Sequence, residues 1–414
     1  MLSKLTSKFF SQLNIQIWIL AIGRLLSSIG TGFTLFYSAI FFVNEVGLSN
    51  SAVGWALGSA SIAGVFGRIL GGAFADSPEW GRKKILLISA IISAVGSFVL
   101  AATYDFWSLV LGQVIIGFGV GLYWPATEAV IADITEGENR REAFTITRFF
   151  DNLGLGIGIV VGGVLIGITG NYRVLFIIDG ISFLVFLYVI WANIRESYQP
   201  KENLSTSPKK INSWLQALTN PSFLLYIAIN IVFTTYISQL HSTIPIYFKN
   251  YITQGNQAIF NETTISLLFT WHLVLSIISQ LPVSRAFKGF PHTYALSISA
   301  SIWGFGFILI WVTGVVGSNQ IIWAILALGI FAIALVAYTP SASSLVADLA
   351  PESQRGVYLS INSLCWAVGY FIGPPLGGWA LDQQRFITDS FWLALAASVV
   401  VTAGFLQVLQ KALR

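Results

Sequence analysis

The chain has 414 residues, of which 55% are hydrophobic and only 10% are charged, and its formal net charge is +4. Soluble domains carry about 25% charged residues because they need a solvated surface, so this composition excludes a soluble globular protein and indicates a chain whose apolar surface faces lipid. Its charges form no basic block of the kind that binds nucleic acid, and the single cysteine, Cys365, excludes an intrachain disulfide.

Long apolar segments follow one another along the whole chain. A helix needs about 20 apolar residues to cross a bilayer, and the first such run is too long for the apolar part of a signal peptide. We therefore expect it to be retained as the first of twelve spans. The twelve lie near residues 15–43, 50–75, 83–104, 106–132, 143–169, 172–194, 221–248, 263–283, 292–315, 319–347, 357–381 and 388–410.

The connections between these spans are short, with one exception. Residues 195–220 are polar and fall almost midway along the chain. The sequence therefore predicts an all-α polytopic membrane protein of two six-helix bundles, at residues 1–194 and 221–414, joined by a linker at residues 195–220. Most lysines and arginines then lie in loops on one side, which the positive-inside rule assigns to the cytoplasm together with both termini.

Charged residues within the spans are candidates for function, because a charge at membrane depth costs a few kcal/mol on insertion scales. Arg24 in the first span and Asp151 in the fifth both lie about 12–13 Å from the same face, at about 1.5 Å of rise per residue. Equal depth permits an ion pair, which is either a permanent structural contact or a switch operated by a proton. Arg148 offers Asp151 a second partner three residues earlier on the same helix.

Other ionisable residues lie in the fourth, sixth, seventh and eighth spans. Glu128 has no obvious cation nearby in the sequence, and burial favours the neutral form of a carboxyl group. Glu128 is therefore the leading candidate for a carboxylate that takes up and releases a proton, unless it already reaches cytoplasmic water. Asp179 is expected to pair with Arg173 or a neighbour, and His241 and His272 are either proton relays or simply hydrogen-bonded.

The second half of the chain repeats a pattern of the first half at a constant offset of 215 residues. Glycines four residues apart lie on one face of a helix and let a neighbouring backbone approach closely. The repeat predicts two related halves, in which the glycine rows serve either plain helix packing or a pliable interface. The matched positions are Pro125, Ala132, Asp133, Arg140, Gly154, Gly158, Gly162 and Gly163 in the first half, and Pro340, Ala347, Asp348, Arg355, Gly369, Gly373, Gly377 and Gly378 in the second.

The loop after the second span resembles the signature loop of the major facilitator superfamily, and the resemblance covers essentially the whole chain. Its motif residues are Gly72, Asp76, Gly81, Arg82 and Lys83, with two more residues than usual between Asp76 and Gly81. The eleventh span is similar to the full glycine–proline motif of the superfamily's drug:proton antiporters, at Gly369, Gly373, Pro374, Gly377 and Gly378. The chain departs from that motif at Ile159 in the fifth span, and Gln113 in the fourth stands where proton antiporters have an arginine.

The resemblance implies the major facilitator fold and a secondary active transporter that works by alternating access. It implies no cofactor or metal, and a monomer in the cytoplasmic (inner) membrane. In the family, charged loops latch the halves together, and the corresponding charges are Asp76, Arg82, Lys83, Asp133, Arg140, Asp348 and Arg355. In the family, spans one, four, seven and ten line the cavity, and here they carry Tyr37, Gln113, Tyr123, Trp124, Asn230, Tyr236, Gln239 and Tyr338.

This aromatic, mildly polar wall suits an amphipathic organic molecule better than a sugar or a phosphate ester. Proton-coupled efflux of such a molecule is the function that the sequence favours. The absent fourth-span arginine keeps open an importer or facilitator of a metabolite, and a non-transporting receptor is a further alternative. An enzyme is not expected, because the chain has no H-E-x-x-H zinc motif and no G-x-x-x-x-G-K phosphate loop, and its three histidines are dispersed.

Overall fold

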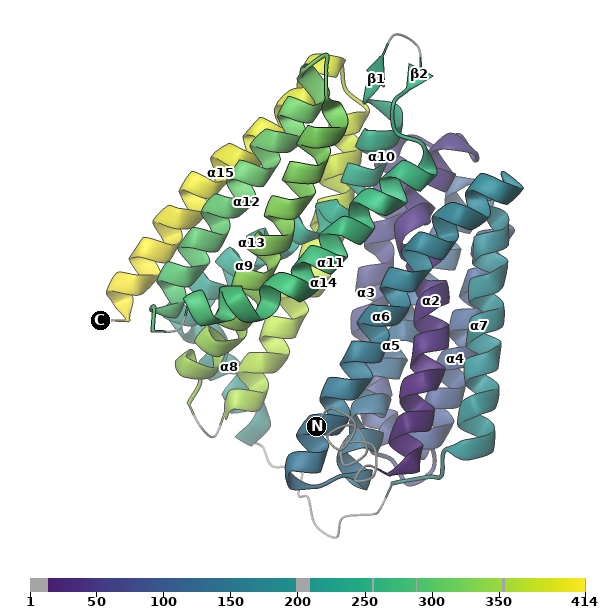
Figure 1. Ribbon diagram of the computed structural model, residues 1–414. Helices are drawn as coiled ribbons and strands as arrows, with labels where there is room; N and C mark the ends of the chain where they lie inside the picture. The colour runs from purple at the N-terminus through teal and green to yellow at the C-terminus, as the bar shows by residue number, and fades with distance from the viewer. Residues whose placement is uncertain (1–13, 199–208, 255–256, 288, 352–353, 414) are drawn as a thin grey trace, which may run out of the picture. The chain divides into compact units, whose positions relative to one another are not determined.

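The computed structural model describes residues 14–198, 209–254, 257–287, 289–351 and 354–413, and these are almost entirely helical (Figure 1). The expected all-α architecture is confirmed; the two short strands, β1 (Thr253–Gln254) and β2 (Gln257–Ala258), form one antiparallel pair. The helices up to residue 193 are α2 (Ile15–Asn44), α3 (Asn50–Ala75), α4 (Gly81–Ala101), α5 (Phe106–Ile134), α6 (Gly137–Thr169) and α7 (Arg173–Asn193). Those that follow are α8 (Lys209–Thr219), α9 (Pro221–His241), α10 (Thr243–Asn250), α11 (Glu262–Ala286), α12 (His292–Val315), α13 (Gln320–Leu349), α14 (Arg355–Leu381) and α15 (Arg385–Ala412).

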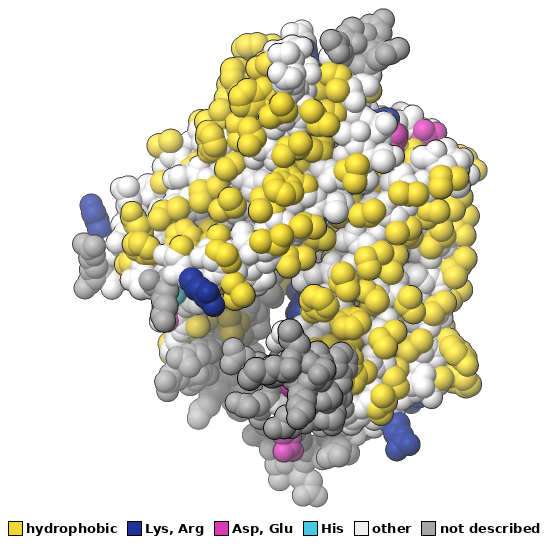
Figure 2. All heavy atoms as spheres, in the orientation of Figure 1, with side chains coloured by type: hydrophobic (Ala, Val, Ile, Leu, Met, Phe, Trp, Pro, Cys, Tyr) yellow, Lys and Arg dark blue, Asp and Glu magenta, His cyan; other side chains and the backbone are white. Residues whose placement is uncertain are grey.

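Eleven helical segments within the described residues are long and apolar enough to cross a membrane, with α9 and α10 forming one segment over Pro221–Asn250. The predicted span at residues 357–381 is present as the 27-residue helix α14. It is not among the eleven because its glycines, prolines, serines and asparagine lower its mean hydropathy. Hydrophobic side chains dominate the face shown in Figure 2. Over the described residues as a whole, large hydrophobic side chains that are exposed include Trp107, Ile168 and Val400. Such a surface matches a lipid environment.

The chain folds as two compact units. Unit 1 comprises residues 1–48 and 59–202, and unit 2 comprises residues 49–58 and 203–414. Helix α3 is therefore shared, because its residues 50–58 belong to unit 2 and the rest to unit 1. The later boundary between the units falls within the polar stretch at residues 195–220, of which residues 199–208 lie outside the described ranges.

The internal repeat extends to the packing of the helices. In unit 1, α2 packs against α6 and α7, and α4 packs against α5 and α7. In unit 2, α9 packs against α14 and α15, and α12 packs against α13 and α15. When the spans of each half are counted from one to six, both units pair one with five, one with six, three with four, and three with six. The two halves are thus built on one plan.

Local chemistry sets the ends of several helices. Asp105 accepts a hydrogen bond from the backbone N–H of Ser108, whose side chain accepts one from the backbone N–H of Asp105, so the two form a capping box at the start of α5. Asn220 caps α9, which has Pro221 at its first position, where the missing N–H is not needed. Helix α6 is capped by Gly170, the residue after its end, whose φ of 62° is in the left-handed region that favours glycine.

The repeated glycines have the same task in both units. A Cβ added at Gly158 of α6 would lie 2.3 Å from the carbonyl oxygen of Ile29 in α2, and one added at Gly369 of α14 would lie 2.2 Å from Oγ1 of Thr234 in α9. Both rows therefore let the fifth span of a half pack directly on the first. The other close neighbours are Leu25 for Gly154, Tyr37 for Gly162, Ser238 for Gly373, Thr243 for Gly377 and Asn50 for Gly378, while Pro374 lies against Gly54 and Gly163 is buried.

Candidate functional site

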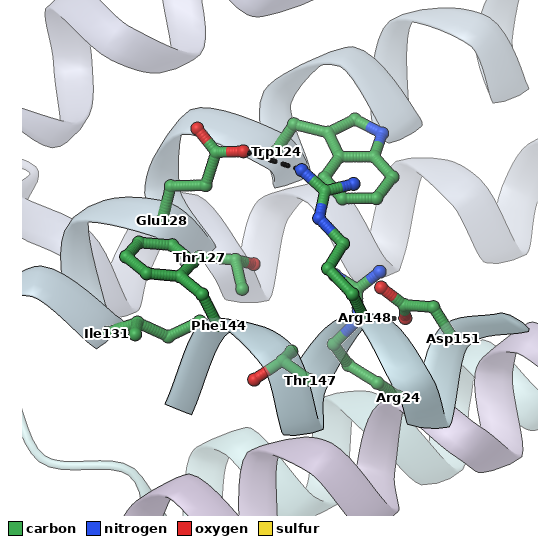
Figure 3. Close-up of a pocket in the computed structure, with 9 residues that line it drawn as sticks. All are labelled: Arg24, Trp124, Thr127, Glu128, Ile131, Phe144, Thr147, Arg148 and Asp151. Carbon is green, nitrogen blue, oxygen red and sulfur yellow. Dashed lines mark hydrogen bonds and ion pairs between the residues drawn. The ribbon is translucent and has the colours of Figure 1, made fainter. Parts of the chain in front are cut away.

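A pocket in unit 1 lies between α2, α5 and α6, towards the end of the unit at which α2 and α6 begin (Figure 3). It combines two arginines and two carboxylates with aromatic and hydroxyl side chains. Its lining residues are Arg24, Trp124, Thr127, Glu128, Ile131, Phe144, Thr147, Arg148 and Asp151. The four charged residues are those that the sequence marks as candidates for proton coupling.

The predicted pairing of Arg24 with Asp151 is confirmed. Nε of Arg24 donates directly to Oδ1 of Asp151, and the two side chains are only 6% and 8% exposed. Oγ of Ser28, one turn along α2 from Arg24, lies 3.4 Å from the same carboxylate oxygen. Because each charge is removed from water, each depends on the other for its compensation.

Glu128 has a cationic partner that the sequence did not reveal, and its half-exposed side chain fits the alternative that it reaches water. Nη2 of Arg148 donates to Oε1 of Glu128 over 3.0 Å, so Glu128 has a cation and Arg148 is not hydrogen-bonded to Asp151 (Figure 3). Both side chains of this second pair are about half exposed, at 53% and 50%. The pocket therefore contains one enclosed ion pair beside one that reaches solvent.

Two aromatic rings of α5 hold the arginines in place. The guanidinium carbon of Arg24 lies 4.2 Å from the ring centroid of Tyr123 and 4.7 Å from that of Trp124. The guanidinium carbon of Arg148 lies 4.4 Å from the centroid of Trp124. One indole thus contacts two cations, which is a favourable arrangement because the negative face of the ring attracts positive charge.

Several polar atoms at the pocket have no hydrogen-bond partner within the described protein. They are Nη1 of Arg24, Oδ2 of Asp151, Oγ1 of Thr127 and the hydroxyl of Tyr123. Buried polar atoms are nearly always hydrogen-bonded in folded proteins, so a cluster of exceptions marks a place with spare donors and acceptors. Within the described ranges, no three His, Cys, Asp or Glu side chains lie close enough to hold a metal ion.

A second cluster of charges surrounds the loop between α3 and α4. Arg82 donates to Oδ1 of Asp76 over 2.6 Å and to Oδ2 of Asp133 over 3.2 Å, so the longer loop still brings these three charges together. Glu196, beyond the end of α7, accepts hydrogen bonds from the backbone N–H groups of Arg82 and Lys83 over 2.9 and 3.0 Å. It satisfies free donors at the start of α4. Glu196 belongs to none of the sequence motifs, because its only signal is that of an acidic residue soon after a span.

The other predicted latch charges have different partners. Arg140 donates to the carbonyl oxygens of Ala132 and Thr135, and therefore caps the end of α5. In unit 2, Oδ2 of Asp348 lies 3.4 Å from Nε2 of His292. This contact matches that of Asp133 with Arg82, because each joins the end of a fourth span to the start of a third. The side chain of Arg355 lies outside the described residues.

Of the predicted cavity residues in unit 1, Trp124 lines the pocket and Tyr123 lies next to it, against the guanidinium group of Arg24. Tyr37 is fully buried and donates to the carbonyl of Ile159, and Gln113 is buried elsewhere on α5. Asp179 does not pair with Arg173, which was one of its expected partners. Arg173 donates instead to backbone carbonyls at the end of α4.

Two of the predicted cavity residues of unit 2, Asn230 and Tyr338, belong to a network of uncharged groups. Tyr338 donates to Asn230, whose Nδ2 donates to Oδ1 of Asn362 over 2.8 Å, and the hydroxyl of Tyr226 donates to the same oxygen over 2.8 Å. The other two predicted residues form hydrogen bonds outside this network, Gln239 with the Gly373 carbonyl and Tyr236 with Ser398. His241 stacks on Tyr370, and Nδ1 of His272 lies 3.0 Å from the Leu328 carbonyl oxygen.

Comparison with known proteins covers almost the whole chain. Residues 20–255 and 251–412 match the family described as Major Facilitator Superfamily. A Na(+), Li(+), K(+)/H(+) antiporter of Planococcus maritimus is 25% identical over 398 residues, 89% of each chain. Multidrug resistance protein MdtH of Klebsiella pneumoniae is 24% identical over 368 residues, 88% of this chain and 86% of the relative.

Solved structures show the same fold at low sequence identity. The nucleoside transporter NupG has a TM-score of 0.79 at 14% identity, over 95% of this chain and 99% of that one. A POT family transporter in complex with 5-aminolevulinic acid has a TM-score of 0.76 at 15% identity, over 95% of both chains. Likeness of this kind concerns the arrangement of the helices alone.

Proposed function

Since the chain belongs to the major facilitator superfamily, we propose that this transporter exports a small amphipathic organic molecule across the cytoplasmic membrane in exchange for protons. One observation carries the proposal: the enclosed Arg24–Asp151 pair lies beside the half-exposed Arg148–Glu128 pair, against the aromatic rings of α5. Paired charges of this kind inside a membrane bundle are typical of proton and substrate pathways.

The geometry favours Glu128 as the group that exchanges protons with water, because it is half exposed whereas Asp151 is enclosed. A proton on Glu128 removes the charge that holds Arg148. The released guanidinium lies on the same helix as Asp151, three residues away, and Oδ2 of Asp151 has no other hydrogen-bond partner. Protonation of Glu128 therefore transfers Arg148 towards Asp151 and weakens the hold of Asp151 on Arg24.

The aromatic pocket supports an amphipathic substrate. Trp124 and Tyr123 offer apolar faces, and the atoms without partners offer both donors and acceptors. The similarity to a multidrug resistance protein points in the same direction. We further propose that the transporter works as a monomer of two six-helix bundles, residues 1–194 and 221–414, with both termini cytoplasmic, and that it carries out no enzymatic reaction.

A second candidate function is exchange of an alkali cation for protons, because a relative of that function is 25% identical over 89% of the chain. The two candidates share the proton-coupling pocket and differ in the partner ion or molecule. A metabolite importer or facilitator, the alternative raised by Gln113, differs from both because it does not exchange its cargo for protons that move the other way.

The test uses purified protein in liposomes with an imposed pH gradient. We expect accumulation of fluorescent amphipathic dyes that collapses when a protonophore dissipates the gradient. Glu128→Gln should abolish gradient-driven accumulation, while Glu79→Gln, at an exposed loop position, should behave as the unmodified protein. Proton movement triggered by Na⁺, Li⁺ or K⁺ but not by dyes would establish the second candidate. Dye transport that ignores the gradient would exclude proton coupling.

A further inference from the structure

A second carboxyl group lies inside unit 1, away from the pocket. Asp179 belongs to α7, six residues after the start of that helix, and is fully buried. Oγ1 of Thr34 in α2 donates to its Oδ2 over 2.6 Å, and Oγ of Ser97 in α4 donates to the same oxygen over 2.8 Å. The other oxygen, Oδ1, has no hydrogen-bond partner in the described protein.

No described cation of the helices packed around Asp179 is available to it. On α2, Arg24 is paired with Asp151, and the hydroxyl of Tyr37 donates to the Ile159 carbonyl. On α7 itself, Arg173 binds the carbonyls of Ala101 and Thr103, and Tyr188 is exposed. The three cations of α4 lie at its start and are bonded there, Arg82 to Asp76 and Asp133, Lys83 to the Trp191 carbonyl and Lys84 to the Glu79 carbonyl.

We propose that Asp179 is a proton-binding site, separate from the pocket, and that its carboxyl group holds a proton in the described conformation. An ionised carboxylate without a cation is costly to bury, and here two donors reach only one of its oxygens. A neutral carboxyl fits these contacts better, because Oδ2 becomes a carbonyl oxygen with two donors and only an uncharged hydroxyl, on Oδ1, is left without a partner in the described protein. The proton would be one of those exchanged in the proposed transport, so this inference rests on the proposed function for its role in coupling.

The surroundings favour a proton over an alkali cation. Gly30 of α2 lies against Oδ1, and a Cβ added there would come within 2.5 Å of both Oδ1 and Oγ of Ser182. The space beside the free oxygen is therefore already filled by a residue without a side chain. A bound cation needs several oxygens arranged around it, whereas a proton adds almost no volume.

The enclosure of Asp179 links the release of its proton to a movement of the surrounding helices. Water cannot reach a side chain with no exposed surface, so its proton can leave only in a conformation in which α2, α4 and α7 separate. The described conformation is thus one in which the proton is occluded. Loss of the proton and rearrangement of these three helices are coupled steps, because the charged carboxylate and the closed packing disfavour each other.

Infrared spectroscopy of the purified protein in lipid tests the protonation directly. At neutral pH we expect a carbonyl stretching band of a protonated carboxylic acid that exchanges slowly in D₂O and is absent from Asp179→Asn. Thr34→Val, which removes one donor to Oδ2 but keeps Asp179, should move the band to higher frequency. Asp389→Asn, the matched control on another buried aspartate, whose partner Arg385 reaches solvent, should leave it in place.

The outcomes separate this inference from the proposed function. Persistence of the band in Asp179→Asn, or its disappearance on addition of Na⁺ or K⁺, would overturn the assignment of a proton to Asp179. In liposomes, Asp179→Asn should carry substrate down its gradient while losing its response to the pH gradient. A variant that responds normally would overturn the coupling role, and a band present in a protein without proton-coupled transport would overturn the proposed function alone.

Discussion

At the scale of single residues, Arg24 and Asp151 form an ion pair in which neither charge can be removed without leaving the other uncompensated. The attraction within a buried pair roughly offsets the cost of taking both charges out of water, so the pair itself adds little stability. Removal of one member leaves a buried charge without compensation, since both side chains are less than a tenth exposed. The pair therefore behaves as one unit.

We expect Arg24→Ala and Asp151→Ala each to lower the free energy of unfolding by about 3–5 kcal/mol, the usual cost of an uncompensated buried charge. The double change Arg24→Met with Asp151→Leu should lose clearly less than either single change, because it removes both charges. Thermal unfolding in detergent measures the differences. A double variant as unstable as the worse single variant would show that the charges do not depend on each other.

The carboxylate of Asp382, just beyond α14, binds backbone N–H groups at the start of α3 and no cation among the described residues. Its oxygens accept from the backbone N–H groups of Asn50 and Ser51, over 2.9 and 2.8 Å, and from the side-chain amide of Asn50, over 2.8 Å. Partial burial raises the pKa of this carboxyl, but these hydrogen bonds outweigh it and hold the pKa below the usual 3.8. The charged form is thus favoured at the start of α3, where helix donors are free.

Asp382→Asn should reduce stability at neutral pH by about 1 kcal/mol, the typical size of a capping or helix-terminus contribution that solvent partly screens. Because the folded-state pKa is the lower one, this contribution is present above pH 3.8 and is lost as the pH falls through the folded value. Melting temperatures of the two proteins should therefore differ at neutral pH and converge in acid. A constant difference across that range would contradict an electrostatic cap.

Some residue contacts could be predicted from the sequence and others could not. The contact between Arg24 and Asp151 could be predicted from their equal depth in the membrane, because the rise per residue fixes how far a side chain lies from the membrane face. Depth alone does not predict the ion pair between Arg148 and Glu128, because that contact also depends on how each helix is rotated about its axis. The hydroxyls around Asp179 were equally hidden, since serine and threonine are common in spans and carry no signal of their own.

At the scale of helices, the seam between α2 and α6 depends on the absence of side chains. Gly154 and Gly158 lie against the backbone of α2, and Gly32 of α2 lies against the backbone of Leu155. Backbone cannot yield as a flexible side chain can. The two helices must separate if either row gains even a methyl group.

Gly158→Ala should therefore destabilise unit 1 by about 1–3 kcal/mol, as overpacking does in other cores. Gly404→Ala is the matched control, because Gly404 lies in helix α15 with no atom near its added Cβ. It should be neutral or stabilising by up to about 1 kcal/mol, since alanine favours helix over glycine. Equal effects of the two substitutions on melting temperature would mean that the seam is not tightly packed.

The spans themselves were predictable from sequence because length and apolarity suffice to define them. The constant offset of 215 predicted two related halves, but it did not say which spans pair within each half. One contact that both halves share had no sequence motif to announce it. Arg173 at the start of α7 and Arg385 at the start of α15 each bind carbonyls at the end of the third span of their own half, at Ala101 and Gly314 respectively. These contacts can be recognised only in the three-dimensional structure, because they depend on where the helix ends lie.

At the scale of the whole molecule, the two halves share a plan but differ in chemistry. Unit 1 contains the Arg24–Asp151 pair and Asp179, whereas the corresponding region of unit 2 uses the uncharged network of Tyr226, Asn230, Tyr338 and Asn362. The sequence anticipated the concentration of buried charge in the first half. It follows that substitutions affecting proton coupling should cluster in unit 1.

The proposed orientation can be tested with cysteine labelling, because Cys365 is the single native cysteine. In a Cys365→Ala background, Asn171→Cys in the loop after α6 should react with a membrane-impermeant maleimide added to intact cells. Glu79→Cys in the loop after α3 should react only after the cells are lysed. Both positions are exposed in the structure, so access to the reagent depends on the side of the membrane. The reverse labelling pattern would invert the orientation.

The Arg24–Asp151 pair also constrains how the protein is made. The two residues are 127 positions apart in the chain, and at about 5–20 residues per second the ribosome needs roughly 6–25 seconds to reach the second. During that time the arginine has no counter-ion, and placing it at the centre of a lone helix costs about 2.5–3.5 kcal/mol. The first span is therefore less stable in lipid before the fifth span is synthesised than afterwards. Insertion of the fifth span consequently adds to the stability of the first.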